Sequence, residues 1–136
     1  MLEKRLTLVV EAPKPKPRPP FPTGVVVVVE GWTELTPGAS LPEIMVAFKW
    51  DGWWFATKYG WRRIVFKIPG HMVTPGEHIL GICNPRDNAY LHIDLLQVYV
   101  FGRKVVERRG VKLGPNKTWP IPTSCIGVRI LIPCLR

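Results

Sequence analysis

The feature that most constrains the fold is a series of short runs of β-branched and aromatic residues, separated by Gly, Pro, Asn or Asp. The turn signals recur about every 8–12 residues, a spacing typical of sandwiches and barrels. No segment has the length and period of a convincing helix. The sequence therefore predicts an all-β protein of about eight or nine strands, folded as a two-sheet antiparallel β-sandwich with a jelly-roll-like arrangement.

Individual strands can be assigned from these runs. Asp51-Gly52 is the strongest turn signal, because Asp-Gly suits the positive φ angles of a two-residue hairpin. Gly110 is expected to end the strand before it. We expect strands at residues 6–10, 25–30, 44–50, 53–58, 61–68, 77–83, 89–101, 104–108 and 125–132.

The 136 residues are a normal length for one domain with its own core. In residues 13–22, Pro alternates with Lys or Arg up to Arg18 and recurs at 19, 20 and 22, which favours an extended polyproline conformation. This segment is too short to separate two domains. We therefore expect residues 1–136 to form a single β-sandwich domain with one stiff, basic extended segment.

Targeting signals are not evident in the sequence. No apolar run approaches the roughly 20 residues that a membrane-spanning helix needs. The apolar patch at residues 6–10 is too short for the core of a cleaved signal peptide. The sequence thus predicts no transmembrane segment, and an intracellular or virion-associated protein.

The three cysteines allow one disulfide bond at most. Few Asn and Gln residues and 15 prolines are typical of proteins from hyperthermophiles, which do keep intracellular disulfides. Cys125 and Cys134 lie at the two ends of one expected strand, roughly 30 Å apart if extended. Any bridge should therefore involve Cys83, although three buried free thiols are the favoured expectation.

The most unusual feature is a group of aromatic residues around the Asp51-Gly52 turn. Such rings can form a platform on which sugar rings or bases stack, or they can fill the core. Because Trp53 and Trp54 are adjacent, one of them should point outward unless the strand bulges. With the neighbouring cations, the candidate ligand- or partner-binding residues are Trp50, Trp53, Trp54, Tyr59, Trp61, Arg62 and Arg63.

The formal net charge of +9 favours anionic partners, although it can also reflect an ordinary solvated surface. The C-terminal third is especially basic. This supports an alternative hypothesis, in which the protein binds nucleic acid through that region and the N-terminal Pro/Lys segment. The candidate residues for this function are Lys14, Lys16, Arg18, Arg103, Lys104, Arg108, Arg109 and Lys112.

Catalytic signatures are weak. His71, His78 and His92 do not have the spacing of a standard zinc site, so we expect no metal and no other cofactor. Cys83 could be imagined as a nucleophile beside a histidine, but no oxyanion loop accompanies it. The sequence therefore favours a protein that is not an enzyme.

Residues 61–101 combine a Trp-led strand, the strand entry Pro75-Gly76-Glu77-His78, and a long strand containing Ile93-Asp94. This series resembles the later strands of jelly-roll sandwiches of the galactose-binding-like, carbohydrate-binding-module type. In overall style the chain is also similar to small β proteins of hyperthermophilic archaea and their viruses. The module resemblance implies a non-catalytic binding protein, whose partner would be a glycan, another protein or a second copy of the chain. The basic C-terminal third departs from that pattern.

Overall fold

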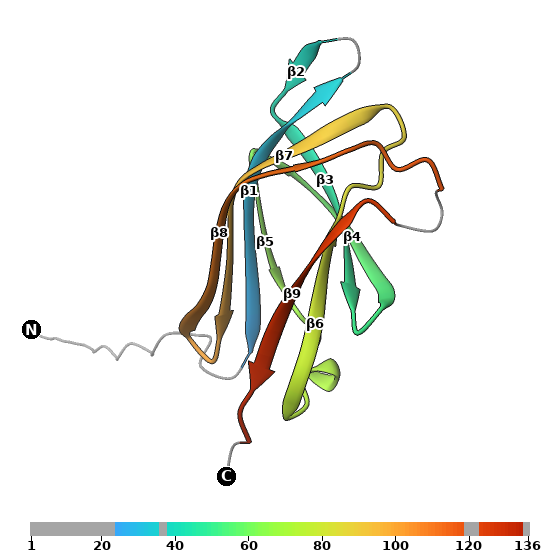
Figure 1. Ribbon diagram of the computed structural model, residues 1–136. Coiled ribbons are helices and arrows are strands. Elements are labelled where there is room, and N and C mark those ends of the chain that lie inside the picture. The colour runs from blue at the N-terminus through green and yellow to red at the C-terminus, as the bar shows by residue number, and fades with distance from the viewer. Residues whose placement is uncertain (1–23, 36–37, 119–122, 135–136) are drawn as a thin grey trace, which may run out of the picture.

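The computed structural model describes residues 24–35, 38–118 and 123–134 (Figure 1). In these residues the chain is all-β, with nine strands in two antiparallel sheets that pack as an open sandwich. The sequence-based prediction of a two-sheet β-sandwich is therefore confirmed. The expected strand at 6–10 and the extended segment at 13–22 lie outside the described residues.

The larger sheet, called the β1 sheet, is built around the first strand. The order β2-β1-β7-β8 runs across it, and β5 pairs with the other half of the same edge of β1. Its edge strand β8 forms a hairpin with β7. The strands are β1 (Val25–Leu35), β2 (Ala39–Leu41), β5 (Arg63–Lys67), β7 (Ala89–Val100) and β8 (Arg103–Leu113).

The smaller sheet, called the β3 sheet, has the order β4-β3-β6-β9. β4 and β9 are its two edge strands. Its members are β3 (Glu43–Trp50), β4 (Trp53–Trp61), β6 (Gly76–Cys83) and β9 (Cys125–Ile132). A 3-10 turn at Gly70–Met72 lies between β5 and β6.

Alternation of apolar residues explains why the two sheets pack face to face. In β3, every second residue from Ile44 to Trp50 is buried, and β1 buries Val25, Val27 and Val29 in the same way. Because successive side chains point to opposite faces of a strand, one face of each sheet is apolar and must be covered. The core fills the space between these faces.

Several strands differ from the predicted ones, and β1 and β4 continue beyond their expected ends, to Leu35 and Trp61. β2 was not expected from its three residues. The expected strand at 61–68 is divided between two sheets, because Arg62 adopts a φ of 64° and turns the chain from β4 into β5. Gly110 does not end β8. It adopts a φ of 68° within the strand, which continues to Leu113.

The cysteine prediction is wrong in its main part. Cys83 and Cys125 form a disulfide bond, and Cys134 is a free, exposed thiol. The antiparallel register of β6 and β9 places Cys83 directly opposite Cys125, with Cα atoms 4.0 Å apart. The expectation that any bridge would involve Cys83 is confirmed. The pairing depends on strand order, which the spacing of cysteines in the sequence does not reveal.

Candidate functional site

The β3–β4 hairpin positions most of the aromatic residues. Asp51 and Gly52 both have positive φ angles, 54° and 90°, as a two-residue hairpin turn requires. The turn places Trp50 opposite Trp53 and allows the two strands to pair along their length. The hairpin that Asp51-Gly52 predicts is therefore present.

Trp50 belongs to the core and not to a binding surface, which corrects the expected set of ligand-binding residues. Its side chain is only 5% exposed. The ring stacks on His78 with centroids 4.8 Å apart, and Nε1 donates a hydrogen bond to the Met72 carbonyl oxygen at 3.1 Å. The inward position follows from the alternation of β3, in which Trp50 continues the apolar series of that strand.

A β-bulge in β4 determines which aromatic residues share the outer face. Phe48 pairs with Ala56, but Lys49 pairs with Trp54, so Phe55 is an extra residue in β4. In a regular strand, Trp54 and Tyr59 would point to opposite faces, because their positions differ by five, an odd number. The bulge shifts this alternation by one position. Both side chains consequently lie on the face of the sheet that points away from the core.

Four aromatic side chains of β4 are exposed. Trp53, at the end of the hairpin, is 79% exposed, and Trp54 is 42% exposed. The sequence predicts that one of these two points outward unless the strand bulges between them. The bulge lies after them, at Phe55, so Trp54, opposite Lys49, lies on the outer face, whereas Trp53, opposite the buried Trp50, is exposed because it lies at the end of the hairpin. Tyr59 and Trp61 follow along the same outer face, at 64% and 73% exposure.

A groove of about 550 Å³ lies between β4 and the loop after β6. Trp54, Thr57 and Tyr59 form one wall, with Met45 of β3 beside them. The indole Nε1 of Trp54 donates to the Thr57 hydroxyl at 3.1 Å and to the Ala56 carbonyl at 3.2 Å, which fixes the orientation of the ring. The opposite wall is polar and consists of Pro85, Arg86, Asp87 and Asn88.

Buried Asn84 holds this polar loop in place. Its Nδ2 donates hydrogen bonds of 2.8 Å to the carbonyl oxygens of Ala89 and Gly114, and its Oδ1 accepts one from the Arg86 amide. The backbone amide of Asn116 donates a hydrogen bond to the backbone carbonyl oxygen of Arg86 at 2.7 Å. These bonds anchor the backbone on both sides of Arg86, so the polar wall is ordered before any ligand binds.

Arg86 is the most constrained charged group of the groove. Its side chain is only 19% exposed, and Nη2 lies 3.5 Å from Glu43 Oε1. Nε is buried and has no hydrogen-bond partner among the described residues. A buried donor without a partner costs free energy, on the order of 1–3 kcal/mol.

The two arginines of the expected aromatic-basic face are not part of the groove. Arg62 lies at the corner between the sheets, where its amide donates to the Pro42 carbonyl at 2.7 Å. Arg63 is already in β5 of the other sheet and lies 3.5 Å from Glu30. The mixture of aromatic and basic residues in the sequence is thus divided by the change of sheet at Arg62.

Residues of the nucleic-acid hypothesis also lie away from the groove. Arg103, Lys104, Arg108, Arg109 and Lys112 all belong to β8, at the edge of the β1 sheet. Lys14, Lys16 and Arg18 lie outside the described residues. The described residues of the nucleic-acid hypothesis and the residues of the groove therefore lie on two different surfaces.

Sequence reasoning missed half of the groove. Residues 84–88 are recognisable as a turn cluster, but nothing in their spacing indicates that they face the aromatic strand. Met45 and Thr57 were missed for the same reason. The information comes from the pairing of β3 with both β4 and β6, which places the end of β6 beside the hairpin.

Two of the three described histidines, His78 and His92, are partners of carboxylates within the structure. His92 Nε2 lies 2.7 Å from Glu34 Oε1, and its ring stacks on Trp32 at 3.9 Å. His78 pairs with Asp51. Within residues 24–35, 38–118 and 123–134, no group of three or more His, Cys, Asp and Glu side chains could hold a metal ion. The same segments contain no helix that could span a membrane.

The Asp51–His78 pair connects the turn of the β3–β4 hairpin to β6. His78 Nδ1 lies 2.7 Å from Asp51 Oδ2, and His78 Nε2 lies 2.8 Å from the Thr74 carbonyl oxygen. Both ring nitrogens can therefore donate only when the ring is protonated. Burial lowers the pKa of His78, but the bonds to Asp51 and Thr74 outweigh it and raise this pKa above 6.5. Burial likewise raises the pKa of Asp51, but bonds from His78 and the Ile79 amide leave it below 3.8.

These shifts predict a pH dependence of stability. The His78 contribution is complete below pH 6.5 and is lost as the pH rises through the raised pKa of the folded protein. The Asp51 contribution is present above pH 3.8 and is lost as the pH falls through its lowered pKa.

We expect a His78→Gln variant to lose about 0.5–1 kcal/mol of unfolding free energy near pH 5.5 and less at pH 9. Urea unfolding at both pH values measures the difference, with exposed His71→Gln as the control. An equal loss at both pH values would contradict the assignment.

Comparison with known proteins gives no relative for this chain: no family model, no curated protein and no solved structure matches it.

Proposed function

We propose that this protein is a non-catalytic binding protein that recognises a neutral glycan in the groove between β4 and residues 85–88. The observation that carries the proposal is the β4 bulge, which brings Trp54 and Tyr59 together on one wall, opposite a fixed polar loop. Flat aromatic rings complement the C–H faces of sugar rings. Carboxylate, amide and guanidinium groups can bond to the hydroxyl groups at the sugar edge.

The composition of the groove supports binding over glycoside hydrolysis. Asp87 is the one carboxylate among its lining residues, and no histidine or cysteine is among them. Glycosidases of the usual type need two carboxyl groups on either side of the scissile bond. Glu43 is half exposed, lies 3.5 Å from the Arg86 guanidinium, and is not among the residues that line the groove. A single lining carboxylate can accept hydrogen bonds from a sugar without cleaving it.

The test is binding of the full chain to neutral oligosaccharides of the β-glucan, mannan and chitin types, measured by calorimetry. For a glycan that the wild type binds, we expect Trp54→Ala and Tyr59→Ala each to weaken binding by about tenfold or more, equivalent to about 1.4 kcal/mol. Trp54→Phe should recover part of the loss, because a ring remains. Binding should change little with salt, since stacking and neutral hydroxyl groups carry it.

The matched control is Trp53→Ala. Trp53 is more exposed than Trp54 but is not among the groove-lining residues, so its removal should change affinity less than about twofold. An equal loss for Trp53→Ala and Trp54→Ala would overturn the assignment to the groove. Failure of the wild type to bind any of the three glycan types would overturn the proposal and direct attention to a protein partner.

A further inference from the structure

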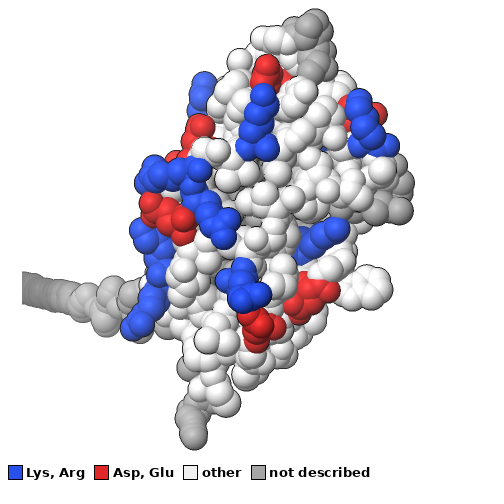
Figure 2. Space-filling model, in the orientation of Figure 1, with Lys and Arg blue, Asp and Glu red and all other residues white. Residues whose placement is uncertain are grey.

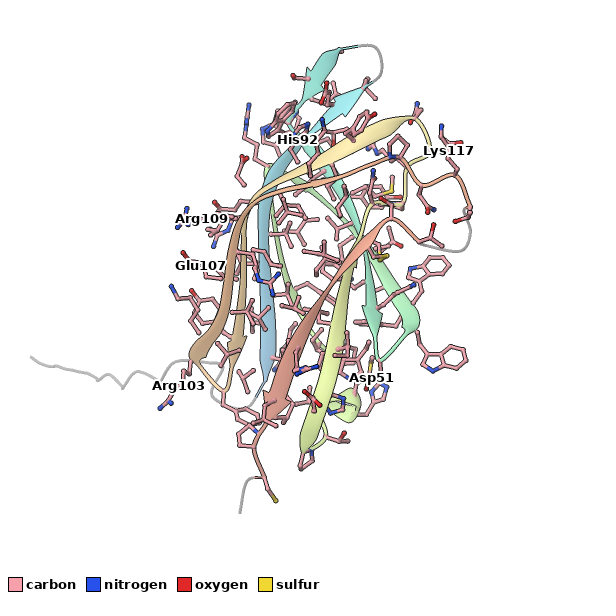
Figure 3. The ribbon with its side chains drawn as sticks, in the orientation of Figure 1. Asp51, His92, Arg103, Glu107, Arg109 and Lys117 are labelled. Atoms are coloured by element: carbon pink, nitrogen blue, oxygen red, sulfur yellow. A yellow bond between two sulfur atoms is a disulfide. The ribbon has the colours of Figure 1, made fainter. Side chains whose placement is uncertain are left out.

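Strand β8 concentrates positive charge at one edge of the molecule. It carries five basic residues and one acid in eleven residues. Figure 2 shows Lys and Arg side chains gathered along the edge that β8 occupies, and Figure 3 shows Arg103, Glu107 and Arg109 projecting from it. At about 3.3 Å per residue, the charged positions 103–112 extend over roughly 30 Å.

Protection of an open edge does not account for this charge. Edge strands commonly carry charged residues to prevent pairing with other chains. The other long edge strands of this protein, β4 and β9, carry only Lys58 and Arg129, respectively. If edge protection were the reason, these two strands should resemble β8. The concentration of cations is therefore particular to β8.

The cations of β8 project from both faces of the strand. Arg103 and Arg108 lie opposite buried residues of β7, Val100 and Leu96, so they emerge on the side of the sheet that faces the core. Lys104, Arg109 and Lys112 lie opposite Tyr99, Leu95 and His92, and emerge on the outer side. Because β8 is the edge strand, both groups reach solvent. The result is a narrow ridge with positive charge on two sides.

Glu107 reduces the charge of the outer side. Its carboxylate lies 2.6 Å from Lys104 Nζ and 3.1 Å from Arg109 Nε, and it accepts a third bond from Gln97. Hydrogen bonds from Lys104, Gln97 and Arg109 lower its pKa to about 2, so it is ionised at neutral pH. No described carboxylate forms an ion pair with Arg103 or Arg108.

We infer that the β8 ridge binds the phosphate backbone of double-stranded nucleic acid, as a second function separate from the aromatic groove. A ridge with cations on both sides fits a duplex groove, which has phosphates along both walls. Single strands are bound by exposed aromatic rings interleaved with cations. β8 has no aromatic residue. Of the rings on neighbouring β7, Tyr90 is covered by Lys112 Nζ at 4.6 Å from its centroid, and Tyr99, opposite Lys104, is partly buried and donates a hydrogen bond to Gln97.

The test is fluorescence anisotropy with a labelled random-sequence DNA duplex of about 20 base pairs, in 50 and 200 mM salt. We expect the affinity of the full chain to fall about 100-fold or more between these salt concentrations. The double variant Arg103→Ala/Arg108→Ala should bind about tenfold more weakly in low salt and lower the salt slope by about 2. The double variant Lys58→Ala/Lys117→Ala removes the same charge elsewhere and should lose less than about threefold.

A charge-increasing pair of variants gives the sharper comparison. Glu107→Gln releases Lys104 and Arg109 and should strengthen duplex binding several-fold. Glu43→Gln makes the same change in net charge but releases Arg86 in the loop after β6, and should have less than about a twofold effect. Equal effects of the two variants, or no binding in 50 mM salt, would overturn the inference.

Tighter binding of a single-stranded oligonucleotide than of the duplex would overturn the assignment to double-stranded nucleic acid. Thermal melts check that all variants fold, and glycan binding should be unchanged in each β8 variant.

Discussion

Removing the Cys83–Cys125 bond is expected to lower the free energy of unfolding by about 4 kcal/mol. The bond links residues separated by 42 positions, so it strongly restricts the unfolded chain. It also joins β6 to the edge strand β9 on the outer side of the β3 sheet. We expect this loss for the Cys83→Ala/Cys125→Ala variant, measured by urea unfolding.

The control for this experiment is the third cysteine. Cys134 is exposed and free, so Cys134→Ala should change stability by less than about 0.5 kcal/mol. A reducing agent should destabilise the wild type but not the double variant. Titration of the unfolded, unreduced protein with a thiol reagent should detect one thiol. Detection of three thiols would contradict the pairing.

The second large effect is expected for Gly31→Ala. Strand β7 bulges against β1 between Glu30 and Gly31, where Asp94 is the extra residue. This irregularity brings the two backbones together, so that a Cβ atom on Gly31 would lie 1.9 Å from the His92 carbonyl oxygen. A backbone atom cannot move aside as a flexible side chain can. The central strand pair of the β1 sheet would have to separate locally, at a cost of about 3 kcal/mol or more.

Gly70→Ala provides the comparison for this substitution. Gly70 is in the 3-10 turn, and no atom lies within 4 Å of the position that its Cβ would take. Its replacement should change the unfolding free energy by less than about 1 kcal/mol. If Gly31→Ala were tolerated as well as Gly70→Ala, the close approach of β1 and β7 would be refuted. Urea unfolding of both variants at one pH decides the question.

The sequence predicts which residues of the groove are candidates for binding, but it does not predict which of them lie together. That Trp54 and Tyr59 are unusual, exposed candidates is predictable, because six aromatic residues cannot all fit on the inner face of one hairpin. That the two side chains share a wall is not predictable, because it depends on the bulge at Phe55. The polar loop at 85–88 comes from a distant part of the chain, and its contact with β4 exists only in three dimensions.

The sequence by itself determined the fold class of this protein. Local signals specify short strands and tight turns: alternating apolar residues, β-branched runs, and Asp51-Gly52 at the hairpin. They are local because side-chain alternation and turn angles depend on neighbouring residues only. A basic C-terminal region is likewise readable directly from the sequence.

Only the tertiary structure decided strand order, register and the change of sheet at Arg62. The strand order places Cys83 opposite Cys125. The bulge in β4 places Trp54 and Tyr59 on the same face, and the turn at Arg62 places Arg63 in the other sheet. Each depends on contacts between segments far apart in the chain, where a shift of one residue reverses the face of every side chain that follows. For this reason the predicted aromatic-basic face is divided: Trp54 and Tyr59 line the groove beside β4, whereas Arg63 lies in β5 of the other sheet.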